Sequence, residues 1–143
     1  MDNDRLKHSI SVARKMVEIG KNYNLKEEEL NKLFLLGYLH DIGYEFNDKT
    51  LEHNKLGGNI LKENNYPFYN EVYYHGEITD EYSSLYLDIL NSADMQIDKY
   101  GNDVGYEKRL NDIKERYGSS SLIYNKCKKL VNILKDKKDY YEK

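Results

Sequence analysis

The segment LLGYLHDIGY, residues 35–44, places a histidine beside an aspartate inside an otherwise apolar run. It closes a helical pattern that begins at residue 26 and is apolar on nearly all sides from Leu33 onward, which predicts a buried central helix over 26–42. Burying an imidazole next to a carboxylate costs free energy unless something compensates. Any fold of this chain must therefore provide partners for His40 and Asp41.

Helical spacing of apolar residues continues through the rest of the chain. It predicts helices over 4–22, over 51–64 with Thr50 as its cap, from Pro67 to about His75, and from Thr79 to about Ile97. Two C-terminal helices are predicted within about 105–136, the first over 105–117. A length of 143 residues suits one core. The prediction is an all-α fold: a single compact domain, 1–143, of about six or seven helices.

Composition restricts the partners and the compartment. The chain carries 22 Lys and Arg against 25 Asp and Glu, a net charge of −3, which argues against a large nucleic-acid footprint. The N-terminus has no apolar signal core, and no run approaches the roughly 20 apolar residues of a membrane span. The single cysteine allows no intramolecular disulfide. We therefore expect a cytoplasmic protein with no nucleic-acid and no membrane partner; the oligomeric state stays open.

All four histidines and two of the aspartates lie in phase with the apolar stripes of different helices. These six residues are His8, His40, Asp41, His53, His75 and Asp94. A lone histidine on an apolar face is more often a core residue bonded to a backbone carbonyl. Six such residues would each need a separate partner, whereas a divalent metal satisfies several imidazoles and carboxylates at once. The pattern as a whole predicts a metal site.

The order His8, His40-Asp41, Asp94 resembles the HD superfamily of metal-dependent phosphohydrolases, whose fold is all-α. Three segments are similar to the family's motif-bearing helices: RLKHSISVARKM, LLGYLHDIGY and LNSADMQID. Some HD branches add two histidines that hold a second metal, and LEHNKLGGNIL and EVYYHGE are similar to those segments. The resemblance covers residues 5 to about 99 and leaves the two C-terminal helices outside it.

The resemblance implies a binuclear site of divalent transition metals, with iron or manganese favoured and zinc, nickel or magnesium possible. One ion would be held by His8, His40, Asp41 and Asp94, and the other by Asp41, His53 and His75. Asp41 would then bridge the two ions and be the catalytic carboxylate. The implied reaction is cleavage of a phosphoester or phosphoanhydride of a small phosphorylated substrate, a nucleotide first among them, by metal-activated water.

The sequence departs from particular HD branches. Branches that cleave cyclic dinucleotides carry a lysine three residues after the HD aspartate and a later GYP motif; here that position is Tyr44 and no GYP follows. The 5′-nucleotidase branch places an acid near this point, and Glu45 is one position off. The two-metal pattern and the small size are most similar to the branch that splits symmetrical dinucleoside tetraphosphates. Substrate identity is therefore open.

Other residues carry weaker predictions. Lys99 follows Asp94 closely and is a candidate for binding a substrate phosphate, although an exposed surface lysine is the commoner reason for such a residue. Glu77 could orient a water or be a solvated loop acid. Cys127 lies on an apolar stripe and is assigned to packing. Two alternative functions use the same ligands: an HD-type di-iron oxygenase and a non-catalytic metal-binding regulatory module.

Overall fold

The computed structural model describes residues 3–47 and 52–141. Within these ranges it contains seven α-helices and one short 3-10 helix, η1, and its one bridge of strand type joins Ile97 to Asp103. The helices are α1 (Asn3–Asn22), α2 (Glu27–Leu39), η1 (Ile42–Glu45), α3 (His53–Glu63), α4 (Tyr69–Tyr74), α5 (Leu85–Asp94), α6 (Gly105–Tyr117) and α7 (Leu122–Tyr141). The all-α prediction and the predicted number of helices are confirmed.

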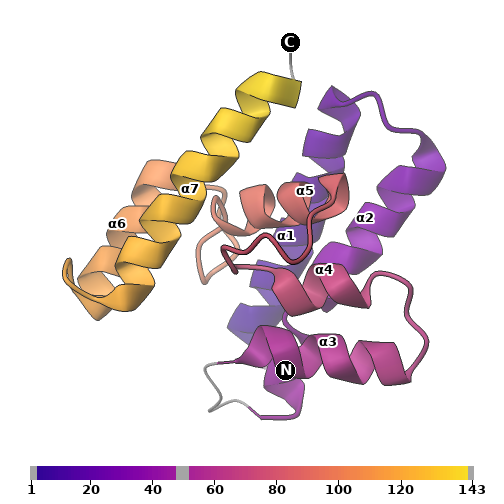
Figure 1. Cartoon of the computed structure of the whole chain (residues 1–143), viewed down its shortest axis with the longest axis horizontal. Coiled ribbons are helices and arrows are strands. Elements are labelled where there is room, and N and C mark those ends of the chain that lie inside the picture. The colour runs from indigo at the N-terminus through magenta and orange to yellow at the C-terminus, as the bar shows by residue number, and fades with distance from the viewer. Residues whose placement is uncertain (1–2, 48–51, 142–143) are drawn as a thin grey trace.

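The helices form a bundle with a hairpin along one side (Figure 1). In the bundle, α1 packs against α2 and α5, and α3 packs against η1 and α4. The hairpin consists of α6 and α7, and it joins the bundle through contacts between α7 and α5. In the described part of the chain, none of the helices is both long and apolar enough to cross a membrane.

Two clusters of buried apolar side chains hold this arrangement together. The larger cluster lies among α1, α2 and α5 and includes Met16, Leu36 and Leu90, all of them fully buried. The smaller cluster joins α6 and α7, with Leu110 and Val131 buried in it. The apolar stripes of the sequence therefore form two separate hydrophobic clusters. The loop after α5 leads from the bundle, which contains the larger cluster, to the hairpin, which contains the smaller one.

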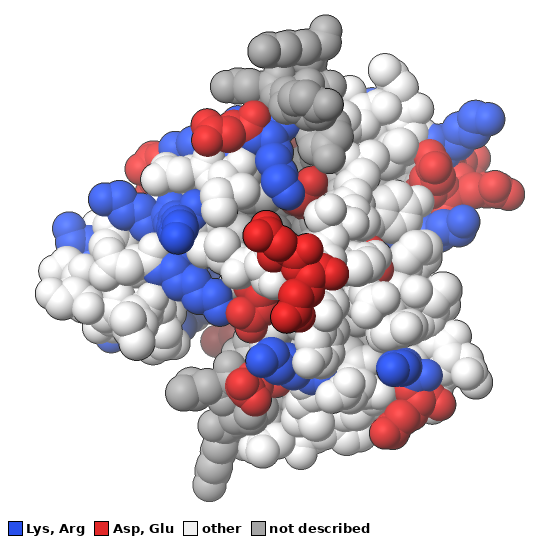
Figure 2. All heavy atoms as spheres, viewed as in Figure 1, with Lys and Arg blue, Asp and Glu red and all other residues white. Residues whose placement is uncertain are grey.

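Ion pairs attach α7 to the bundle. Lys126 bonds Glu77, which follows α4, and Lys137 bonds Asp88 in α5, each at 2.9 Å. On the face drawn in Figure 2, basic side chains gather on the side formed by the hairpin, and acidic side chains gather near the centre, where the loop between α4 and α5 runs. Opposite charge therefore supplements apolar packing at the junction between bundle and hairpin.

The predicted start and end of the fifth helix are wrong, because α5 covers 85–94 rather than 79–97. Its N-terminus is set by Ser84, whose hydroxyl accepts the backbone N–H of Leu87 at 3.0 Å. The residues before it form a loop that is fixed from inside the protein: Tyr82 and Ser84 both donate to the buried carboxylate of Glu71. Apolar spacing in this stretch therefore reflects packing of an irregular loop.

Smaller differences occur at four other helix ends. The helix predicted over 26–42 ends at Leu39, and a turn at His40 and Asp41 leads into η1. The third helix begins at His53, and its predicted cap, Thr50, lies outside the described residues. Pro67 occupies a turn before α4 rather than its first turn. The last helix continues to residue 141, beyond the predicted limit of about 136.

Candidate metal centre

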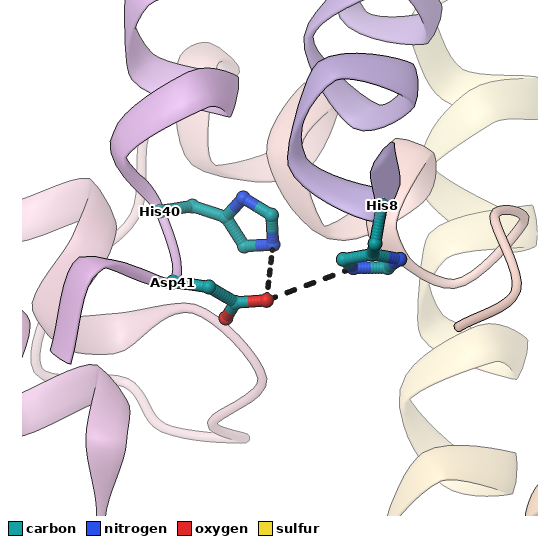
Figure 3. A group of neighbouring side chains, drawn as sticks. All are labelled: His8, His40 and Asp41. Atoms are coloured by element: carbon teal, nitrogen blue, oxygen red, sulfur yellow. Dashed lines mark ion pairs between the residues drawn. The ribbon is translucent and has the colours of Figure 1, made fainter. Parts of the chain in front are cut away.

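Five helices bring the six predicted ligands together. His8 comes from the buried side of α1, while the other five stand at helix ends: His40 and Asp41 follow α2, His53 begins α3, His75 follows α4, and Asp94 ends α5. Figure 3 shows how the α1 histidine and the pair after α2 point toward one another across the gap between these helices. Side chains at helix ends can converge on one point because the backbone turns away there.

Glycines allow the helices that carry these residues to approach closely. A Cβ added to Gly37 in α2 would lie 2.6 Å from the Cα of Ala13 in α1. A Cβ added to Gly43 in η1 would lie 2.0 Å from the carbonyl oxygen of His53. Both neighbours are backbone atoms that a side-chain rotation cannot move. These two glycines therefore set the spacing of α1 with α2 and of η1 with α3.

Gly43→Ala is expected to destabilise the protein by about 2 kcal/mol or more, because overpacking against backbone forces the two segments apart. The substitution should also lower metal content, since it displaces His53. Urea unfolding and elemental analysis measure the two effects. Gly20→Ala is the matched control: its new Cβ would meet only the side-chain ends of Leu33 and Leu30, at 2.7 and 2.8 Å, which can shift. Equal stability and metal content in Gly43→Ala and the wild type would contradict this steric account.

Backbone carbonyls fix the orientation of three imidazole rings. The Nδ1 atom donates to the carbonyl of Gly37 in His40 (2.6 Å), of Val72 in His75 (2.6 Å) and of Asp98 in His8 (2.9 Å). A carbonyl only accepts, so Nδ1 carries the proton and Nε2 faces the cluster. This is the arrangement in which neutral histidines bind metals. The Nε2 atom of His40 is moreover fully buried and has no hydrogen-bond partner among the described residues.

The carboxylate of Asp41 lies between two groups of histidines. Its Oδ2 atom is 3.2 Å from Nε2 of His40 and 3.7 Å from Nε2 of His8. Its Oδ1 atom is 3.1 Å from Nε2 of His53 and 3.5 Å from Nε2 of His75. One oxygen of Asp41 therefore faces each of two groups of histidines.

Asp94 lies nearest to His8 and His40, although one donor group within 4.8 Å also joins it to His75. Its Oδ1 atom is 2.8 Å from Nε2 of His8 and 3.4 Å from Nε2 of His40. One half thus contains His8, His40, Asp94 and one oxygen of Asp41, while the other contains His53, His75 and the second oxygen of Asp41. Subsets of these donors lie within 4.8 Å of one another, close enough to share an ion. The clustered donors are those of a divalent metal site.

Both carboxylates are held in their charged form. Burial alone would raise the pKa of Asp41, but the charge of His40 and the close approach of the His40, His53 and His75 rings outweigh burial and hold that pKa well below its usual value. The pKa of Asp94 is likewise lowered against the effect of burial, by hydrogen bonds from His40 and His8. Burial would lower the pKa of His40, yet the two aspartates raise it well above the ordinary value. The cluster therefore presents two negative charges that attract a cation.

A stack of rings supports the outer edge of the cluster, and the sequence analysis did not anticipate it. The ring of Tyr44 lies parallel to that of His53, with centroids 4.2 Å apart, and the guanidinium carbon of Arg5 lies 3.7 Å from the Tyr44 ring centroid. Burial, followed by the charge of Asp41, raises the pKa of Tyr44 to about 12. The residue three positions after the HD aspartate therefore packs against a candidate ligand.

A cavity of about 380 Å³ opens beside the cluster. His8 and Asp41 form part of its wall, and Lys99, the candidate for binding a substrate phosphate, lines it as well. Arg5 of α1 also lines this cavity, as do two cations of α6, Arg109 and Arg116. Sequence reasoning missed these two, although their spacing of seven residues puts them on one side of a helix.

The remaining sequence candidates lie apart from the six ligands. The carboxylate of Glu77 accepts hydrogen bonds from Lys126 (2.9 Å) and from Asn54 (3.2 Å). Burial would raise the pKa of Glu77, but these partners lower it. Cys127 packs against the apolar cluster of α6 and α7, and burial raises the pKa of its thiol. The thiol thus lies in the packing environment that its stripe predicted.

An all-helical fold whose helix ends converge on histidines and aspartates defines a class of metal-binding helical domains. A family model described as the HD domain matches residues 5–131. The chain therefore belongs to the HD-domain family, as the motifs predicted, and the matched region extends past residue 99 into α7. Neither the curated proteins nor the solved structures that were compared give a match to this chain.

Proposed function

We propose that this protein is a divalent-metal-dependent phosphohydrolase that cleaves a phosphoester or phosphoanhydride of a small phosphorylated substrate. The observation that carries the proposal is the position of Asp41, whose two oxygens face separate groups of histidines. Membership of the HD-domain family adds to it. The open cavity at the same carboxylate gives a small molecule access to the cluster.

The proposed cofactor is a pair of transition-metal ions. The half with His8, His40 and Asp94 offers a complete set of side-chain ligands when Asp41 is included, and the half with His53 and His75 leaves room for water or substrate. Imidazole-rich sites favour iron or manganese over magnesium. Metal ions bound here would supply charge stabilisation for phosphoryl oxygens and lower the pKa of a water.

The protein's own residues have definite tasks in this reaction. The carbonyl-bonded histidines keep their Nε2 atoms directed at the cluster, and Asp41 fixes the separation of its two halves. The water oxygen forms a bond to phosphorus, the bond from phosphorus to the leaving oxygen breaks, and the proton of the water ends on the leaving group. Lys99, which lines the cavity, would bind a phosphate oxygen of the substrate.

A metal analysis combined with a substrate panel tests the proposal. Purified protein should hold about two transition-metal ions per chain, and it should release inorganic phosphate or a phosphorylated product from at least one nucleotide or phosphoester. The same panel run without oxygen separates hydrolysis from the di-iron oxygenase chemistry, because only the latter stops. Trace metal in careful preparations, with no uptake on reconstitution, would refute the metal site.

A further inference from the structure

A second cavity adjoins the cavity beside the cluster. The second cavity, of about 490 Å³, lies along α6 and the loop after α5. The two cavities share three lining residues, and all three are cations: Lys99, Arg109 and Arg116. Of these two cavities, the first is lined by His8 and Asp41, and the second is lined by none of the six candidate ligands. The shared cations therefore stand between the cluster and the second hollow, which extends away from it.

Within the described part of the chain, no ion pair neutralises these three cations. None of them lies within 4.0 Å of an acidic group among the described residues, although neighbouring Lys108 finds Asp112 at 3.7 Å. The Nε atom of Arg109 is buried and, within the described part of the chain, has no hydrogen-bond partner. A buried guanidinium N–H without an acceptor costs free energy, so this side chain carries donor capacity that the described residues leave unused.

Three acids line the second cavity, namely Asp98, Asp112 and Glu115, and Asp98 is already engaged. Its carboxylate accepts the backbone N–H groups of Tyr100 and Asn102, each at 2.9 Å. Burial would raise the pKa of Asp98, but these bonds, with a smaller effect of the Arg109 charge, lower it. The carboxylate thus shapes the loop after α5 and leaves the guanidinium available.

The chemistry of the three side chains selects a phosphate chain. A guanidinium donates two parallel hydrogen bonds that match the oxygens of a phosphate, and an ammonium adds a point charge. A monoester would place its one phosphate at the metal cluster and leave little for three further cations to bind. A substrate with linked phosphates places one at the cluster and the next among these cations.

We propose that Lys99, Arg109 and Arg116 form a binding site for the distal phosphate of a substrate that contains at least two phosphates linked by an anhydride. The assignment of the other phosphate to the metal cluster rests on the proposed function. The α6–α7 hairpin, on this view, supplies substrate selection to a cluster that α1 to α5 build. Binding by the cations needs no metal and can be measured separately.

The test compares linked and single phosphates by titration calorimetry at physiological salt, where weak surface attraction is screened. The probes are tripolyphosphate, pyrophosphate and inorganic phosphate, added to metal-loaded and to metal-free protein. Wild type should bind tripolyphosphate at least about tenfold more tightly than phosphate in either form. Arg109→Gln together with Arg116→Gln should remove most of that difference and leave phosphate binding to the metal-loaded protein nearly unchanged.

Arg14→Gln is the matched control, since Arg14 is an exposed arginine of α1 that lines neither cavity. It should bind every probe as the wild type does. The single variant Arg116→Gln, at an exposed residue, guards against misfolding of the double variant. Adenosine triphosphate titrated alongside tripolyphosphate separates a nucleotide from an inorganic chain: tighter binding of either one identifies the source, and both require the arginines.

Unchanged tripolyphosphate affinity in the double variant, or an equal loss for phosphate and tripolyphosphate, would overturn the distal site. These failures differ from failure of the proposed function. Arginine-dependent binding of tripolyphosphate without hydrolysis of any substrate would support the site and remove the enzyme assignment. Hydrolysis that does not depend on the arginines would support the enzyme assignment and remove the distal site.

Discussion

Replacing Asp41 with alanine is expected to remove most of the bound metal and to lower kcat/KM by at least about a thousandfold. The reason is the position of its two oxygens, one facing His40 and the other facing His53, at 3.2 and 3.1 Å. The substitution takes one ligand from each half of the cluster at once. Elemental analysis and steady-state kinetics on the best substrate of the panel measure the two losses.

Two further variants separate ligand loss from structural damage. Asp41→Asn keeps the size of the side chain but removes the negative charge, so it should fold and still lose metal. Asp80→Ala, an exposed acid in the loop between α4 and α5, should leave both metal content and rate unchanged. Activity above about a tenth of the wild-type value in Asp41→Ala would show that the ligand assignment is wrong.

The six candidate ligands could be predicted from the sequence because they lie at helical spacing from apolar residues. His8 and His40 lie in phase with apolar residues, so a buried helix forces their side chains inward wherever the helix packs. Five of the six residues stand at helix ends, and small errors in those ends did not change which way the side chains point. The apolar pattern alone therefore identified the residues of the cluster before any distance was known.

The loop between α4 and α5 was beyond the same reasoning. Tyr82 continues the helical spacing that leads into α5, yet its hydroxyl bonds the buried Glu71 instead. A buried carboxylate with two hydroxyl donors is a tertiary interaction that spans more than ten residues. The local spacing of apolar residues carries no information about this tertiary interaction. The same spacing therefore fits a helix and a loop that is held by hydrogen bonds to a buried residue.

The cations of the cavity illustrate a second limit. The sequence shows that Arg109 and Arg116 share a side of α6, but that side would be an ordinary solvated surface in most packings. Its role depends on where the hairpin lies against the bundle, and the ion pairs of Lys126 with Glu77 and of Lys137 with Asp88 help to fix that position. The position of the α6–α7 hairpin on the bundle depends on the packing of the whole fold, so the local sequence of α6 does not predict it.

His53→Ala and His75→Ala are each expected to reduce metal content from about two ions per chain to about one, and to lower the rate by several orders of magnitude. Both histidines face Oδ1 of Asp41, at 3.1 and 3.5 Å, whereas His8 and His40 face Oδ2. Loss of either therefore empties one half of the cluster and leaves the other half complete. Elemental analysis of each variant gives the stoichiometry.

The double variant provides the stricter test of this division. If the two histidines hold one ion together, removing both should cost hardly more activity than removing either, because residues that act as a unit are not additive. Core histidines would behave otherwise: metal content would stay constant and their costs in stability would roughly add. Asn64→Ala, at the exposed end of α3, controls for changes in that helix. Unchanged stoichiometry in both single variants would reduce the cluster to a mononuclear site formed by His8, His40, Asp41 and Asp94.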